Sequence, residues 1–453
     1  MDPATTLSPS YKKNIFAIAV PAIFETLATT LASMIDSKMV SSMGTAAISA
    51  IAVTVQPRLF ILCFFTALHT VLTTLVAIHL GKDDHENANR IFLTSLSICA
   101  LAAVILGIAA AAAAVPIMRL CSGQEDTMQM SVTYFRIMML GTVFDSLCAN
   151  INSGLRGCGK TKVTFASNLI SCVVNIFFNY LLIEGHWGFP ALGITGAALA
   201  SVIGFAAAML FSIVYLLTAD TYLSLSYCRK NRIGPSMKAI PGIFKLWKHT
   251  YLQDLMTRIG TLISSSVTAR IGSFETSIYS LGMNWMNVNF AFGKGFQTAG
   301  VALVGRSLGA GKKDDIHIYS RKITRYSLVT SLLLIIPVVL LAAPYYRLHS
   351  DSEEFVRIGF FVNTIVAVIS VFQIVKIAQT GLLQGLGNMK LPMIAATLSV
   401  TILQPIANFV FITLLDLGIW GVWLSIFLSQ VCWMICTCIF YKRTLRNLDR
   451  ISA

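Results

Sequence analysis

The sequence predicts an all-α integral membrane protein whose twelve transmembrane helices form two related six-helix bundles. The 453-residue chain is 56% hydrophobic and only 12% charged, which is too apolar for an ordinary soluble domain. Apolar runs of about 20 residues, the length that crosses a hydrocarbon core of ~30 Å, recur along the whole chain. Several residues also recur at one fixed offset, which indicates an internal duplication.

Hydropathy gives the spans in order. The first begins near Asn14 and lacks the cleavage site of a signal peptide, so we expect it to stay attached. The predicted spans cover residues 14–42, 47–80, 91–118, 128–152, 163–184, 192–217, 249–271, 276–308, 324–343, 355–382, 393–414 and 418–441. The ten cysteines lie scattered in apolar runs without metal-ligand spacing, so we interpret them as packing residues.

Lysine and arginine are concentrated on one side of these spans. Twenty-four of them fall on the side of the N-terminus and six on the opposite side. By the positive-inside rule both termini are cytoplasmic. The same distribution accounts for the net charge of +14, so we expect no nucleic-acid partner.

The duplication divides the chain into two lobes. Residues 219–248 are polar and basic, fall at the midpoint and carry two Gly–Pro breaks, which indicates a linker between lobes 1–218 and 249–453. The pairs at an offset of 228 are Gly44 and Gly272, Ser49 and Ser277, Gly81 and Gly309, Gly157 and Gly385, Gly159 and Gly387, and Lys162 and Lys390. Because six spans separate equivalent positions, the repeats enter the membrane in the same direction. We therefore expect a pseudo-twofold axis along the membrane normal and a cavity between the lobes.

One nucleotide-binding pattern is formally present. Residues 154–161 match GxxxxGK[ST], but they lie between two spans with no preceding strand, and the repeat partner lacks the Lys-Thr pair. We interpret these glycines as a tight cytoplasmic turn.

The turn motifs resemble those of the multidrug and toxic compound extrusion (MATE) family. They read Leu155-Arg-Gly-Cys-Gly-Lys-Thr-Lys162 and then Gly193-Ile-Thr-Gly196, repeated as Leu383-Gln-Gly-Leu-Gly-Asn-Met-Lys390 and Gly418-Ile-Trp-Gly421. Asp36 and the helix end Leu303-Val-Gly-Arg-Ser-Leu-Gly-Ala-Gly311 also match. The resemblance covers nearly the whole chain and implies two bundles facing each other in a V, with alternating access driven by Na⁺ or H⁺ entry.

Ionisable residues inside the bilayer mark candidate sites, since each charge there is costly. Asp36 is the first of them. Eleven residues before it on the same predicted helix lies Glu25, within ~20° of the same face. Both carboxylates can therefore face one cavity and exchange H⁺ or Na⁺ there. The alternative for Asp36 is a structural pairing with Arg58.

The fifth predicted span carries an asparagine stripe, Asn168, Asn175 and Asn179, which can bind a small cation or neighbouring helices. In archaeal and some bacterial members of the family, the cation site joins the first-helix Asp to an Asn and an Asp on the fifth helix and a hydroxyl on the sixth. The resemblance places Asp36, Asn175, Asn179 and Ser201 there, with Asn179 standing where an Asp would be. The missing carboxylate weakens Na⁺ chelation, so the choice between Na⁺ and H⁺ stays open.

The second lobe supplies further candidates for the substrate cavity, beside Glu25 and Arg58. They are Gln253, Asp254, Asn284, Asn287, Lys294, Gln373 and Lys376. Asp254 has a structural alternative, because Arg258 follows at i+4 and can neutralise it. Buried Lys294 and Lys376 repel an organic cation unless they are deprotonated or paired, or unless the substrate is zwitterionic or anionic.

The function implied by the resemblance is an antiporter that exports an amphipathic small molecule in exchange for Na⁺ or H⁺. No cofactor is expected beyond a possible Na⁺ as coupling ion. We expect a monomer in the cytoplasmic membrane of a prokaryote. The alternatives are a flippase for a lipid-linked glycan, a channel, and a membrane-embedded transferase or hydrolase. An enzyme would need a catalytic set at a membrane face, and the seven histidines are dispersed.

Overall fold

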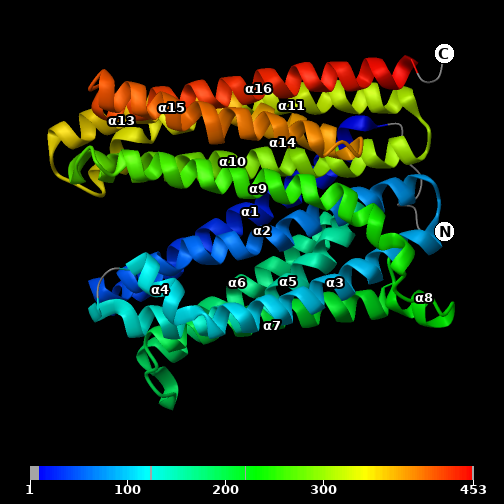
Figure 1. Ribbon diagram of the computed structural model, residues 1–453, viewed down its shortest axis with the longest axis horizontal. Coiled ribbons are helices and arrows are strands. Elements are labelled where there is room, and N and C mark those ends of the chain that lie inside the picture. Colours follow the sequence, from blue (N-terminus) through cyan, green and yellow to red (C-terminus); the bar gives the residue numbers. More distant parts are fainter. Residues whose placement is uncertain (1–9, 123–124, 220, 451–453) are drawn as a thin grey trace. The chain divides into compact units, whose positions relative to one another are not determined.

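The computed structural model describes residues 10–122, 125–219 and 221–450, and none of these residues lies in a β-strand. Long helices dominate it (Figure 1). Their bounds are α1 (Tyr11–Ser41), α2 (Thr45–Gly81), α3 (His85–Ala112), α4 (Ala114–Ser122), α5 (Glu125–Gly157), α6 (Thr161–Glu184), α7 (Ile194–Thr218), α8 (Leu225–Lys230), α9 (Ile240–Thr268), α10 (Ser273–Gly309), α11 (Lys313–Leu340), α12 (Ala342–Arg347), α13 (Glu353–Gly385), α14 (Lys390–Ala396), α15 (Gln404–Asn408) and α16 (Gly418–Arg450). Two π-helical segments, Thr397–Leu403 and Phe409–Leu414, continue α14 and α15 into one span.

Ten helical segments of the described chain are long and apolar enough to cross a membrane. Helices α9 and α10 are also long, with 29 and 37 residues. With them, the described residues contain twelve long helical segments, one for each predicted span. The structure extends several of the predicted ends, because a helix continues into the polar interface while hydropathy detects only its apolar part.

The largest differences from the predicted spans lie at two places. The span predicted at 91–118 is broken at Ala113, after which α4 begins a new direction. The span predicted from 324 begins at Lys313, because the first three turns of α11 are charged and continue the helix out of the apolar region.

Helix bounds extend the duplication from single residues to whole elements. An offset of 228 superimposes both ends of α2 on those of α10, both ends of α3 on those of α11, and both ends of α5 on those of α13. The turn glycines keep their roles, since Gly159 and Gly387 have positive φ angles of 77° and 73°. An L-residue rarely adopts this conformation, which explains why both repeats retain glycine there.

Contacts divide the chain into two compact units. Of the described residues, those in the range 24–247 form unit 1, and residues 10–23 and 248–450 form unit 2. The boundary falls inside α1, two residues after Pro21. The first turns of α1 belong to unit 2, where Tyr11 donates to Asp315 at 2.7 Å and Asn14 donates to the Tyr319 hydroxyl at 2.9 Å.

Each unit has one central helix. In unit 1, α5 packs against α2, α3 and α7, and α6 packs against α7 (Figure 1). In unit 2, α13 packs against α10, α11 and α16, with Trp423 and Tyr346 fully buried in the core. The central helices α5 and α13 are repeat partners, so both units use the same packing scheme.

The segment predicted as a linker is held against unit 1. Asn89 of α3 is fully buried, donates to the Tyr222 carbonyl at 2.9 Å and accepts from the Ser224 N–H at 3.2 Å. Trp247 donates to the Phe64 carbonyl at 3.0 Å. These bonds satisfy backbone groups that a connecting segment would otherwise leave to solvent.

Candidate functional site

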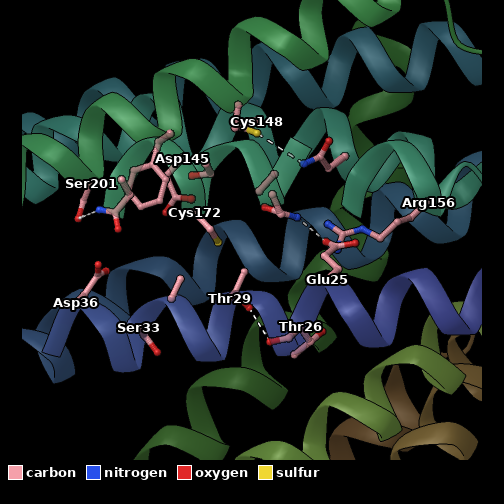
Figure 2. Close-up of a pocket in the computed structure, with 18 residues that line it drawn as sticks. Glu25, Thr26, Thr29, Ser33, Asp36, Asp145, Cys148, Arg156, Cys172 and Ser201 are labelled. Carbon is pink, nitrogen blue, oxygen red and sulfur yellow. Dashed lines mark hydrogen bonds and ion pairs between the residues drawn. The ribbon is translucent and has the colours of Figure 1, made fainter. Parts of the chain in front are cut away.

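A cavity of about 430 Å³ lies within unit 1, between α1, α5, α6 and α7 (Figure 2). Its size lies within the range of small-molecule sites. Its lining is Glu25, Thr26, Thr29, Ala32, Ser33, Asp36, Asp145, Cys148, Ala149, Asn152, Arg156, Asn168, Ser171, Cys172, Asn175, Ser201, Phe205 and Ala208.

Helical periodicity produces this polar lining. On α1, Thr26, Thr29, Ser33 and Asp36 follow one another at intervals of three or four residues, so they form one stripe on the cavity face. Figure 2 shows this stripe running along α1 from Thr26 to Asp36. The hydroxyls of Thr29 and Ser33 donate to carbonyls one turn back, which leaves their acceptor lone pairs toward the cavity.

Asp36 lies at one end of the cavity, and its hydrogen-bond partners among the described residues are neutral. Asn179 donates to its Oδ1 at 2.7 Å. The Asn175 amide lies 2.7 Å and 3.1 Å from the two carboxylate oxygens; with its nitrogen toward Asp36 it donates to both, and its oxygen accepts from the Ser201 hydroxyl and N–H at 3.1 Å and 3.2 Å. With the amide turned by 180°, its oxygen faces Asp36 and its nitrogen donates to the Ser201 hydroxyl at 3.1 Å. The structure thus brings together the four residues that the resemblance placed in one site.

The Oδ1 atom of Asn179 is buried and has no hydrogen-bond partner among the described residues. A buried acceptor without a donor is costly, and a cation beside the carboxylate would satisfy it.

Glu25 lies at the opposite end of the cavity in a different environment. Arg156 donates to its Oε1 at 3.0 Å, Asn168 donates to the same oxygen at 2.7 Å, and Thr164 donates to Oε2 at 2.7 Å. The carboxylate is thus ion-paired and fully hydrogen-bonded. Of the predicted asparagine stripe, Asn168 serves Glu25 while Asn175 and Asn179 serve Asp36.

Arg58 is not the partner of Asp36. Its guanidinium pairs with Asp145 of α5 at 3.6 Å. Asp145 lines the cavity beside Asp36 and Glu25, whereas Arg58 is absent from the lining. The structural alternative for Asp36 therefore has no support in the geometry.

Sequence reasoning missed Asp145, Arg156 and Thr164. Asp145 lies in the predicted span 128–152, so the cost of a charge in the bilayer could have identified it as it identified Asp36. Arg156 was counted on the cytoplasmic side because it lies in the turn motif. Its side chain reaches back to the cavity, which no pattern in the sequence indicates.

The candidates in unit 2 have separate partners. Lys376 is buried and lies 3.6 Å from the centre of the Trp433 ring, and Lys294 lies 5.4 Å from that of Phe290. Such contacts stabilise a cation on an aromatic face. Gln373 donates to the Met286 carbonyl, and Asn284 donates to the Tyr345 hydroxyl, both at 3.3 Å. Gln253 is buried, Asp254 is half-buried and Asn287 is exposed.

No group of three or more His, Cys, Asp or Glu residues in the described ranges could hold a metal ion. A twelve-helix chain with an acidic, hydroxyl-rich cavity inside its first unit is typical of a multi-pass membrane transporter. The MatE family profile matches residues 21–181 and 251–410, and the chain belongs to this family of membrane transporters. The two matched segments repeat the duplication, and the membership confirms that the protein is not an enzyme.

The relatives and solved structures named below match between 86% and 99% of the chain. The chain is 23% identical to the "Probable multidrug resistance protein NorM" of Thermotoga maritima, covering 98% of this chain and 93% of the relative. It is 24% identical to the NorM of Halalkalibacterium halodurans, covering 86% and 85%. A MATE crystal structure in complex with MaD3S superimposes with a TM-score of 0.91 at 18% identity, covering 99% of each chain. A MOP superfamily transporter from Pyrococcus furiosus gives 0.90 at 19% identity, again covering 99% of each. The predicted all-α, twelve-helix fold class is confirmed.

Proposed function

We propose that this protein is a secondary antiporter that exports amphipathic small molecules from the cytoplasm as Na⁺ or H⁺ enters. Membership of the MatE family and similarity to relatives named as multidrug resistance proteins support this function. A flippase for a lipid-linked glycan gains no such support.

The charge pairing of the cavity carboxylates supports a coupling role for Asp36. Three carboxylates line the cavity, and two of them are neutralised by arginines: Glu25 by Arg156 and Asp145 by Arg58. Asp36 has no cationic partner among the described residues and is held by amides alone. A carboxylate in a membrane-embedded cavity needs a compensating charge, so Asp36 is the group that an entering cation would neutralise.

The groups around Asp36 suit either coupling ion. For Na⁺, the site offers the Asp36 oxygens, the Ser201 hydroxyl, the orphaned Asn179 oxygen and, after an amide rotation, the Asn175 oxygen. Small hard cations prefer such oxygen ligands. For H⁺, a protonated Asp36 would donate to the rotated Asn175 amide. In both cases the Asn175 orientation follows the state of Asp36.

The cavity charge also bears on the exported molecule. The lining contains three carboxylates and one guanidinium, so it favours organic cations. We place both termini in the cytoplasm of a prokaryotic cell and expect a monomer, because the basic residues lie on the side of the termini and each unit contains its own core.

Asp36→Asn tests this function. The substitution keeps the amide contacts and removes the charge, so we expect gradient-driven efflux to fall at least about 100-fold. The measurement is efflux of a fluorescent organic cation from proteoliposomes, with Na⁺ and H⁺ gradients imposed separately. Asp351→Asn, at an exposed position outside the cavity, should retain full efflux. Unchanged efflux in Asp36→Asn would refute the coupling role.

A further inference from the structure

Glu25 and Arg156 meet at the end of the cavity opposite Asp36 (Figure 2). Eleven residues of α1 separate the two carboxylates, an axial distance of about 16 Å. The side chain of Glu25 is 8% exposed and that of Arg156 is 26% exposed. The Arg156 side chain is thus the more accessible member of the pair, and both side chains line the cavity.

The bonds around Glu25 show that its site does not depend on arginine alone. Thr164 and Asn168, both on α6, donate to separate oxygens and would remain if Arg156 moved away. The charge on the carboxylate would then still require a cation. Arg156 is also held by Ser153, at 3.1 Å from its second terminal nitrogen, so its guanidinium has one anchor outside the carboxylate.

We propose that Glu25 binds the cationic head group of the exported molecule, and that the Arg156 guanidinium is a tethered competitor which occupies the same place when the cavity holds no substrate. This inference rests on the proposed export function and names its substrate class. Substrate binding is then an exchange of one cation for another at Glu25, and the carboxylate is never left unpaired.

The geometry selects cations that donate hydrogen bonds. Arg156 contacts Glu25 through an N–H donor at 3.0 Å, so its replacement must supply a similar N–H group. Guanidinium, amidinium and primary ammonium groups do so, whereas a quaternary ammonium does not. Ala32, Ala149, Phe205 and Ala208 provide apolar wall for the rest of the molecule. The substrate class is therefore an amphipathic cation with an N–H-bearing head.

A tethered competitor gives the two partners opposite effects, which a purely structural ion pair cannot do. Removing Glu25 removes the ligand's partner, and removing Arg156 removes its competitor. The competitor lowers the apparent affinity by the fraction of time that it leaves the site free. If the pair only stabilised the fold, both substitutions would weaken binding.

The test compares Glu25→Gln and Arg156→Gln in lipid nanodiscs, with dodecylguanidinium as the probe and calorimetry as the readout. We expect Glu25→Gln to weaken binding by about 10- to 100-fold, which is the loss of one charge-assisted hydrogen bond. We expect Arg156→Gln to tighten it by at least about 10-fold, since an intramolecular competitor acts at a high effective concentration. Dodecyltrimethylammonium, which lacks N–H donors, should change less than about threefold in Glu25→Gln.

Two variants keep the result decisive. Glu25→Gln/Arg156→Gln should bind as weakly as Glu25→Gln, because no carboxylate is left. If Arg156→Gln does not fold, Arg156→Lys replaces it and should tighten binding by about threefold, since a lysine reaches Glu25 with fewer donors. Weaker or unchanged binding in the arginine variant, or tighter binding in the double variant, overturns the proposal.

The coupling role of Asp36 and the substrate-binding role of Glu25 can be refuted independently of each other. Equilibrium binding needs no gradient, so Asp36→Asn should bind dodecylguanidinium within about threefold of the unsubstituted protein at a distance of about 16 Å. Retained efflux in Asp36→Asn would refute the coupling role, while the binding series would still decide the role of Glu25.

Discussion

Two carboxylates on one helix, facing one cavity, have different environments. Glu25 is neutralised by a guanidinium and two neutral donors, whereas Asp36 is surrounded by amides and a hydroxyl. The periodicity of α1 places both on the cavity face. The partners come from α5, α6 and α7, so only the packing of these helices assigns different roles to the two acids.

Asn179→Asp adds a carboxylate beside Asp36, because the Asn179 side chain already lies 2.7 Å from it. Two acids at this distance cannot both ionise without a cation between them. We expect the Na⁺ concentration for half-maximal efflux to fall by about 10-fold, which is roughly the effect of one added charged ligand. Na⁺ titrations of efflux at constant pH measure this change.

Asn231→Asp is the matched control for that substitution, since Asn231 is exposed in the segment after α8. It adds the same charge far from the cavity and should leave the Na⁺ dependence unchanged. A Na⁺ dependence that is the same in both variants would contradict the assignment of Asn179 to the cation site.

At the level of the helices, the duplication preserves the helix bounds but not the side chains that cap the helix ends. Helices α3 and α11 have the same length and equivalent bounds. Asp84 caps α3 by accepting from the Asn87 N–H at 3.2 Å, while Lys312, which precedes α11, makes no side-chain cap. The cap therefore belongs to one repeat only, as do the ionisable groups of the cavity.

The Asp84 cap makes the stability of α3 depend on pH. Burial opposes the ionisation of Asp84, but hydrogen bonds from Asn87 and His79 outweigh it and hold the pKa of this carboxyl below its usual value. A depressed folded-state pKa means that the ionised cap stabilises the fold above the unfolded pKa of about 3.9. That contribution is lost as the pH falls through the lower, folded-state pKa.

We therefore expect Asp84→Ala to lower the free energy of unfolding by about 1 kcal/mol at pH 7, and by progressively less below about pH 4. Thermal unfolding of the detergent-solubilised protein between pH 3 and pH 7 measures this difference. Asp84→Asn retains an acceptor for the cap and should lose the pH dependence while keeping most of the stability. A constant difference between Asp84→Ala and the unsubstituted protein across this range would contradict the role of ionisation.

On the scale of the whole molecule, the charge distribution predicts the membrane topology. The basic residues that give the net charge of +14 lie mainly in the turns on the side of the termini and in residues 219–248. This segment is bonded to α3 through Asn89 and to α2 through Trp247. It therefore packs as part of unit 1, although the sequence suggested only a connection.

Labelling from each side of the membrane checks this topology. Trp187, 75% exposed between α6 and α7, should face the outside, and Asn231 should face the cytoplasm. Cys121 is exposed and would react as well, so both variants carry Cys121→Ser. In this background an impermeant maleimide should label Trp187→Cys in intact cells and Asn231→Cys only after permeabilisation. Labelling in the reverse pattern would overturn the orientation.

Sequence alone determined the helices, their order and their duplication. Hydropathy and the 228-residue offset depend only on local composition and spacing. Because the chain is duplicated, the pattern of helices in one half supports the pattern predicted for the other half. The grouping of Asn175, Asn179 and Ser201 with Asp36 was also predicted, because the family resemblance placed these four residues in one site. The ends of the helices were less accurate, since a helix such as α11 continues beyond the apolar region that hydropathy detects.

Tertiary structure decided how the charges are paired. Arg58 was a possible partner of Asp36 and binds Asp145 instead, and Arg156 reaches from the last turn of α5 to Glu25. Each pairing joins different helices, at separations of 87 and 131 residues in the chain. Helical periodicity gives the face on which a side chain lies, but the neighbouring helix on that face depends on packing. That packing leaves Asp36 as the one cavity carboxylate of the described chain without a cation.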